Sequence, residues 1–152
     1  EKKRLAWIYI PVFHDLSLYD WIEREHQSII VMDMMANYVH TPILDTSNPD
    51  SIFRGLAEKL ANMPMGRESR GPMEYYTDAV ISLCQDYKCD AAIFSGHIAC
   101  KHGWAIAKLV KDQIQDELGI PTLVFDLDCF DPRNTSSESI KAKLDDFFSV
   151  IF

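Results

Sequence analysis

The 152-residue sequence lacks the features that would place it in several large functional classes. No apolar run is long enough to span a bilayer, and the stretch from Leu5 to Ile10 is too short for the core of a signal peptide. No P-loop, G-x-G-x-x-G or G-x-S-x-G motif occurs, which argues against ordinary nucleotide binding and serine hydrolysis. We therefore expect a cytoplasmic protein without a membrane partner.

Basic charge is also scarce. The chain carries 15 Lys and Arg against 23 Asp and Glu, a formal net charge of −8, and its one basic cluster is the short Lys2-Lys3-Arg4. Nucleic acid is therefore not an expected partner, because its phosphates would be repelled. The 4 cysteines are few, and in a reducing compartment they suit free thiols or metal ligands better than a disulfide framework.

What the sequence does contain is a regular alternation of short apolar runs and helical patterns. Strands are predicted at residues 5–10, 29–33, 91–95 and 122–125. Helices are predicted between and after them, with capping boxes at Ser17 and Thr135, and the longest irregular segments at 38–48 and 62–72. This alternation predicts one α/β domain over residues 1–152, with a four-stranded parallel sheet and helices on both faces. The abrupt start without Met suggests a piece of something longer.

Such a sheet brings the loops after its strands to one edge, where open α/β proteins bind their ligands. Cysteine, histidine and aspartate are concentrated in those loops. The residues that we expect at this edge are His14 after the first strand, Asp33 after the second, His97 and Cys100 after the third, and Asp126, Asp128 and Cys129 after the fourth.

The third of these loops is the most informative, with the sequence Ser95-Gly-His-Ile-Ala-Cys-Lys-His-Gly103. A thiolate at Cys100 could bind iron or zinc, and Gly96 and Gly103 would let the backbone approach closely. Lys101 and the dipole of the following helix would stabilise a thiolate or an anion. Equally, Cys100 could be a half-buried thiol that only packs. A zinc site made of His97, Cys100 and an aspartate is a third reading, although no second ligand pair is present.

Two further groups leave alternatives open. Asp126 and Asp128 could share one side of the chain for acid–base work or cation binding, or they could simply form turns. Arg67 and Arg70 could clamp a phosphate or carboxylate, or belong to a solvated loop. A metal-free α/β module that binds a small anion or serves regulation is therefore the alternative to a metal enzyme.

Several segments, taken together, resemble the 2-hydroxyacyl-CoA dehydratase D-component and benzoyl-CoA reductase family. The resemblance covers about residue 72 to the end most closely and is looser before that. The segments are Cys89-Asp-Ala-Ala-Ile-Phe94, His97-Ile-Ala-Cys-Lys101, Gly119-Ile-Pro-Thr-Leu-Val124, Asp126-Leu-Asp128, Asp131-Pro-Arg133 and the closing Ile140-Lys-x-Lys-Leu-x-x-Phe-Phe148. The chain looks like the C-terminal domain of one subunit.

The resemblance implies flavodoxin-like domains and an anaerobic iron–sulfur enzyme that is a heterodimer of related subunits. Each subunit holds a [4Fe–4S] cluster through three cysteines, and a separate ATP-dependent iron–sulfur activator protein supplies one electron. The implied reaction is dehydration of an (R)-2-hydroxyacyl-CoA through a ketyl radical, or, in the benzoyl branch, reduction of the benzoyl-CoA ring. Either way the implied substrate is an acyl-CoA.

Carried over residue by residue, the resemblance assigns the family's C-terminal cluster cysteine to Cys100. The other two cluster cysteines belong to a portion that this sequence does not contain, and Cys84, Cys89 and Cys129 do not take their place. We therefore expect this fragment alone to be inactive. The candidates for contacts to the cluster or the substrate cavity are His97, Lys101, His102, His14, Asp33, Asp126 and Asp128.

Overall fold

A computed structural model describes residues 1–37, 44–67 and 70–152 of the chain. Its centre is a four-stranded sheet in the order β2-β1-β3-β4, in which every neighbouring pair is parallel. The strands are β1 (Lys3–Tyr9), β2 (Ser28–Asp33), β3 (Ala91–His97) and β4 (Thr122–Leu127). The predicted parallel α/β sheet is therefore confirmed, and its flavodoxin-like order follows from the pairing.

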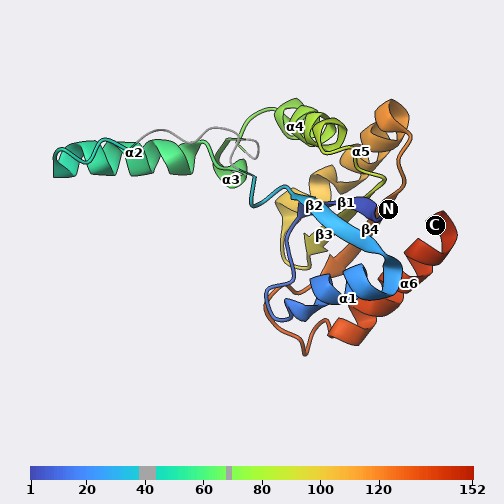
Figure 1. Cartoon of the computed structure of the whole chain (residues 1–152). Coiled ribbons are helices and arrows are strands. Elements are labelled where there is room, and N and C mark those ends of the chain that lie inside the picture. The colour runs from blue at the N-terminus through green and yellow to red at the C-terminus, as the bar shows by residue number, and fades with distance from the viewer. Residues whose placement is uncertain (38–43, 68–69) are drawn as a thin grey trace.

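Helices cover both faces of this sheet, as predicted. Helices α4 and α5 lie on one face, and α1 and α6 lie on the other (Figure 1). Their bounds are α1 (Ser17–His26), α4 (Met73–Asp86), α5 (Lys101–Leu118) and α6 (Ser137–Ile151). Because each helix turns one apolar stripe to the sheet, the strands between them are buried from both sides.

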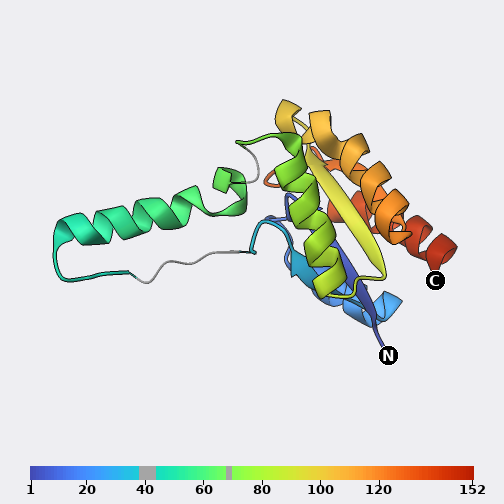
Figure 2. The same cartoon turned by 90° about the horizontal axis from the view of Figure 1, so that it is seen from above.

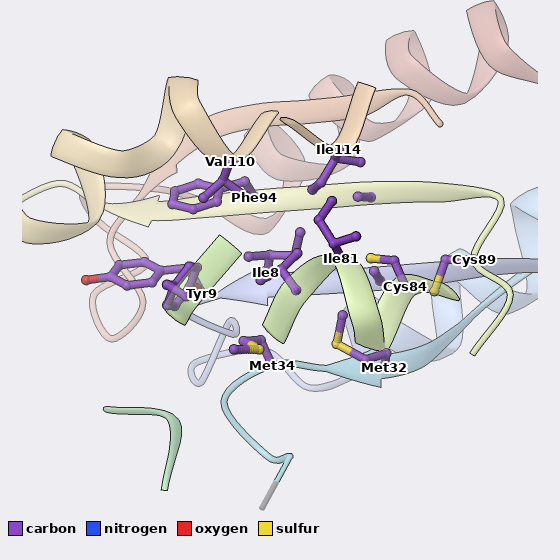
Figure 3. Close-up of a cluster of buried hydrophobic side chains, with 14 of the residues drawn as sticks. Ile8, Tyr9, Met32, Met34, Ile81, Cys84, Cys89, Phe94, Val110 and Ile114 are labelled. Atoms are coloured by element: carbon purple, nitrogen blue, oxygen red, sulfur yellow. The ribbon is translucent and has the colours of Figure 1, made fainter. Parts of the chain in front are cut away.

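Two hydrophobic clusters form the core, one on each face. The cluster under α4 and α5 contains Tyr9, Phe94 and Val110 (Figure 3). The cluster under α1 and α6 is built around Trp7, which is 0% exposed. The ring of Trp7 meets those of Tyr19 and Phe125 edge-on, at centroid distances of 5.5 and 6.4 Å. Alternation along β1 sends Ala6 and Ile8 to the first cluster and Leu5 and Trp7 to the second, so this strand anchors both faces.

Helix α2 (Pro49–Ala61) stands away from this body (Figures 1 and 2). It begins as predicted, at Asn48, whose side chain accepts the backbone N–H of Ser51 in a capping box, with proline in the first turn. None of its residues is buried, and Phe53 and Leu60 are 70% and 63% exposed. The periodic apolar stripe thus indicated a helix without indicating what covers it.

The predicted irregular segments contain more structure than expected. The loop expected over residues 62–72 includes a short helix, α3 (Pro64–Arg67), and its residues 68–69 lie outside the described ranges. Residues 38–43 of the other irregular segment also lie outside them. Within the described ranges, no helix is long and apolar enough to cross a membrane.

Two predicted helix starts are wrong in detail. Helix α1 has Leu16 at its N-cap, and Ser17 instead donates its backbone N–H to Asp15 at 3.0 Å. Helix α6 is capped by Ser136, whose hydroxyl accepts the N–H of Ser139. Thr135, the expected cap, accepts the backbone N–H of Asp128 at 2.9 Å. Several hydroxyl residues in succession allow more than one cap, and tertiary partners decided between them.

The second strand also differs from its prediction as a strand covered on both faces. Ile29 is 37% exposed. Because β2 is an edge strand, its cover is incomplete: Met32 is buried in the cluster under α4 and α5 and Ile30 packs against the cluster under α1 and α6, but Ile29 stays partly exposed.

Candidate functional site

The strand order reverses direction between β1 and β3, and this fixes the geometry of the carboxyl edge. The connection after β1 leads to β2 on one side of it. The later connections lead to β3 and then β4 on the other side. The loops after β1 and β3 therefore diverge and leave a crevice, which is the usual ligand position in an open α/β sheet. Tyr9 ends β1 and His97 ends β3, so both lie at the rim of this crevice.

Cys100 lies at this crevice as the N-cap residue of α5. Its Sγ lies 2.7 Å from the hydroxyl of Tyr9 and is half-buried. Burial alone would raise the pKa of the thiol, but hydrogen bonds from Tyr9 and from the backbone N–H groups of Gly103 and His102 outweigh burial and hold the pKa below its usual value. The site therefore makes a thiolate easier to form than in a free cysteine, and the thiolate is the form that binds metals and reacts as a nucleophile.

Tyr9, which the sequence analysis did not single out, is the residue that holds this sulfur. Its ring is 1% exposed and stacks on Phe94 at a centroid distance of 5.4 Å. Burial, followed by the bond to Cys100, raises the pKa of Tyr9 well above its usual value, so the phenol stays protonated and donates to the sulfur. Its backbone has a φ of 80°, a strained conformation for an aromatic residue, and such strain concentrates at functional sites.

The glycines of the motif serve packing between helix and strand. A Cβ on Gly103 would lie 2.3 Å from the ring of Tyr9, and one on Gly96 would lie 2.6 Å from the ring of Trp104. The sequence predicted that these glycines let the backbone approach a ligand. In the structure they let the backbone approach the rings of Tyr9 and Trp104. Gly103 leaves the space in which Tyr9 reaches Cys100.

Replacing Tyr9 by phenylalanine should raise the pKa of Cys100, because it removes the side-chain donor to the thiolate. A hydrogen bond to a charged group contributes roughly 1.5 kcal/mol, and partial exposure reduces this, so we expect alkylation by iodoacetamide at pH 7 to slow about three- to tenfold. The alkylation rate, measured as a function of pH, should have its midpoint at a higher pH than in the unmodified protein, because the Cys100 thiol then loses its proton at a higher pH.

Tyr19→Phe is the matched control, because the Tyr19 hydroxyl accepts the N–H of Val12 on the opposite face of the sheet. It should leave the rate unchanged. Cys100→Ser gives the background from the other cysteines, which are buried. Equal rates for the Tyr9→Phe and unmodified proteins would show that the hydroxyl does not stabilise the thiolate.

A second group of ligand-type side chains lies at the same edge. His97, Asp128 and Cys129 each offer one atom, and these atoms all lie within 4.8 Å of one another. The Nδ1 atom of His97 faces the Sγ of Cys129 at 3.7 Å. Cys129 belongs to the core cluster under α1 and α6, whereas Cys100 packs against the cluster under α4 and α5. The two thiols therefore belong to different faces of the sheet.

Hydrogen bonds hold Asp128 in its ionised form. The side chain of Asn134 and the backbone N–H groups of Phe130 and Asp131 donate to its carboxylate and lower its pKa to about 2. Burial, together with the negative charge of Asp128, raises the pKa of the Cys129 thiol. Asp128 thus combines the turn-forming role considered from the sequence with a place in this group.

The other predicted residues have separate surroundings. Lys101 and His102 lie exposed on the first turn of α5. Asp126 pairs with Lys143 at 3.1 Å, so it does not share the partners of Asp128. Asp33 accepts the N–H of Met35 at the end of β2, and burial raises its pKa.

His14 follows β1 and is half-buried, and its charge would lower the pKa of Asp131. Asp131 itself is ion-paired with Arg133 at 2.6 Å, as a turn residue would be. His14 is therefore associated with the turn after β4 rather than with Cys100.

The two arginines of the segment before α4 lie around one hollow. A pocket of about 570 Å³ is lined by Arg67, Arg70, Gly71 and Tyr75. Its lining does not include Cys100 or the His97 group. The anion clamp considered from the sequence is thus compatible with the structure, at a place separate from both thiol sites.

The fold and the edge define a class: a parallel α/β domain that presents an activated cysteine at its topological switch point. A family model described as 2-hydroxyglutaryl-CoA dehydratase, D-component, matches residues 1–151. The chain belongs to this family, which confirms the resemblance. Members of the family are components of acyl-CoA dehydratases. A search of curated proteins found no match.

Proposed function

We propose that this chain is one domain of an iron–sulfur 2-hydroxyacyl-CoA dehydratase and that Cys100 binds its cluster. The observation that supports this most directly is the Cys100 sulfur itself, which is half-buried at the switch point, lies 2.7 Å from the Tyr9 hydroxyl and has its pKa lowered by that hydroxyl and by the backbone N–H groups of Gly103 and His102. Hydrogen bonds to cysteine sulfur are a means by which proteins tune iron–sulfur clusters. The same donors would stabilise the negative charge that a ligating thiolate carries.

The donor set suits one ligand of a cluster and no more. A [4Fe–4S] cluster is usually held by four thiolates. Within the described ranges, Cys129 lies in the core of the other face, and Cys84 and Cys89 lie in the core near the far end of α4, away from the switch point. The remaining ligands would come from protein beyond these residues, in agreement with a C-terminal domain that is inactive alone.

When bound, the cluster would supply single-electron chemistry to the acyl-CoA, with the electron coming from an ATP-dependent activator protein. Tyr9 positions and stabilises the Cys100 thiolate, and its own raised pKa keeps its proton in place. His97, at the end of β3, and Lys101, on the first turn of α5, lie at the rim where an acyl-CoA cavity shared with a related subunit would open. A reductase of benzoyl-CoA would use the same cysteine.

The test is anaerobic production of the protein together with its partner subunit, with and without Cys100→Ser. We expect the iron and sulfide of this chain to be lost with Cys100, so that only the cluster of the partner subunit remains, and dehydration of (R)-2-hydroxyglutaryl-CoA to be lost as well, because one ligand of the cluster is removed. Cys89→Ser is the matched control, since it removes a buried thiol away from the edge. Assays with benzoyl-CoA distinguish reductase from dehydratase.

The alternatives give different results. An iron content of the Cys100→Ser pair equal to that of the unmodified pair would refute the proposal. Zinc bound through Cys100 would indicate a zinc enzyme instead. Absence of metal from both proteins would favour the metal-free anion-binding module, whose pocket is the one lined by Arg67 and Arg70.

A further inference from the structure

We propose that His97, Asp128 and Cys129 form a binding site for a single zinc-type divalent cation, separate from the sulfur of Cys100. This proposal does not depend on the cluster, because it uses a different thiol on the other face of the sheet. It differs from the zinc reading considered from the sequence, which paired His97 with Cys100.

The first argument is the choice and spacing of donor atoms. Imidazole nitrogen, thiolate sulfur and carboxylate oxygen are the three ligand types that zinc takes in proteins. With Zn–S of about 2.3 Å and Zn–N of about 2.05 Å, two ligands at a tetrahedral angle lie roughly 3.6 Å apart. The observed separation of His97 Nδ1 and Cys129 Sγ is 3.7 Å. The carboxylate of Asp128 completes a triangle whose sides do not exceed 4.8 Å.

The second argument is that the backbone around each ligand is already fixed. The carbonyl of His97 accepts hydrogen bonds from the N–H of Cys100 at 2.9 Å and the indole of Trp104 at 3.1 Å. The N–H of Asp128 donates to Thr135, and the carbonyl of Cys129 accepts the N–H of Phe13 at 3.0 Å. Little ordering remains to be done on binding, which favours affinity.

Outer contacts of the kind found in metal sites are present too. Asn134 donates to one oxygen of Asp128 at 2.8 Å, while two backbone N–H groups donate to the other at 3.1 Å. Such contacts orient a carboxylate and leave lone pairs for a metal. Asp128 and Cys129 are 9% and 3% exposed and His97 is half-buried, so the ligand residues are held in the protein rather than free on its surface.

Charge balance also favours a cation. The carboxylate of Asp128 lies beside the Cys129 thiol in the core, and histidine binds a metal ion as neutral imidazole. A divalent cation would displace one proton from Cys129 and leave the site neutral, with one thiolate, one carboxylate and two positive charges. Three protein ligands leave a fourth position, as in catalytic zinc sites, for water or a substrate oxygen.

The test is titration of the purified, cluster-free chain with Co²⁺, followed by displacement with Zn²⁺. We expect one cobalt ion per chain, a thiolate-to-cobalt absorption band, and loss of that band when zinc is added. Cys129→Ser should abolish the band and weaken cobalt binding at least about 100-fold, and His97→Gln should weaken it about tenfold or more. Circular dichroism checks that each variant is folded.

Cys100→Ser is the matched control and should keep both the band and the affinity. A band that disappears with Cys100 and survives Cys129→Ser would overturn the proposal, as would unmodified protein that binds no cobalt. Neither outcome bears on the iron content of the assembled enzyme. If Cys100→Ser loses the cluster in the assembled enzyme but still binds cobalt as the cluster-free chain, the two results support the two sites independently.

Discussion

Replacing Trp7 by alanine should lower the free energy of unfolding by about 3–5 kcal/mol, the range typical of large aromatic deletions in cores. Trp7 is 0% exposed and central to the cluster under α1 and α6. Its deletion removes contacts with Tyr19 and Phe125 and leaves the carbonyl of Ile10 without the indole N–H that it accepts at 3.1 Å. Denaturation with urea, followed by circular dichroism, measures the change.

Phe53→Ala is the matched control, because it also removes an aromatic ring but from the exposed stripe of α2. Phe53 is 70% exposed, so we expect a change within about 0.5 kcal/mol. A loss at Trp7 no larger than the loss at Phe53 would show that the face under α1 and α6 is not packed as described. A large loss at Phe53 would show that α2 is covered in solution.

The contrast between Trp7 and Phe53 also shows how far the sequence could predict the fold. Alternation of apolar runs and helical stripes correctly indicated the strands and the main helices, because burial imposes those periods. The stripe of α2 has the same period, yet α2 packs against nothing in the described ranges beyond the short α3 and its own connections. Periodicity records that a face is apolar, and only tertiary structure shows what it contacts.

The candidate site was predicted in part for a related reason. The sequence placed His97, Cys100, Asp128 and Cys129 at the same edge, since each follows a parallel strand. It could not decide which of them meet, because that depends on the strand order and on which face each side chain joins. The pairing of β3 with β4, with His97 opposite Leu127, brings His97 to Cys129 instead of to Cys100.

Tyr9 was missed because it reads as an ordinary apolar residue of a strand. One signal was available: Gly103, in the first turn of a helix, is costly there unless a neighbour needs its space. The structure shows that neighbour to be Tyr9. A glycine at a helix start next to a candidate cysteine is therefore a hint that another side chain reaches that cysteine.

Replacing Gly103 by valine should lower the free energy of unfolding by about 3 kcal/mol, near the upper end of the usual cost of overpacking. The new Cβ would lie 2.3 Å from the ring of Tyr9, and this ring cannot easily move. It is stacked on Phe94, is 1% exposed, and extends from a backbone already held at a φ of 80°. Urea denaturation measures the loss of stability.

Gly103→Val should also lower the reactivity of Cys100. Displacement of the Tyr9 ring would move its hydroxyl away from Cys100, so alkylation at pH 7 should slow in the same direction as in Tyr9→Phe. Ala105→Val is the matched control, because it adds a β-branched side chain at an exposed position in the same helix turn and should cost about 0.5 kcal/mol. If Gly103→Val retained full stability and an unchanged Cys100 reactivity, the contact between Tyr9 and the start of α5 would be refuted, and with it the physical basis of the activated thiolate.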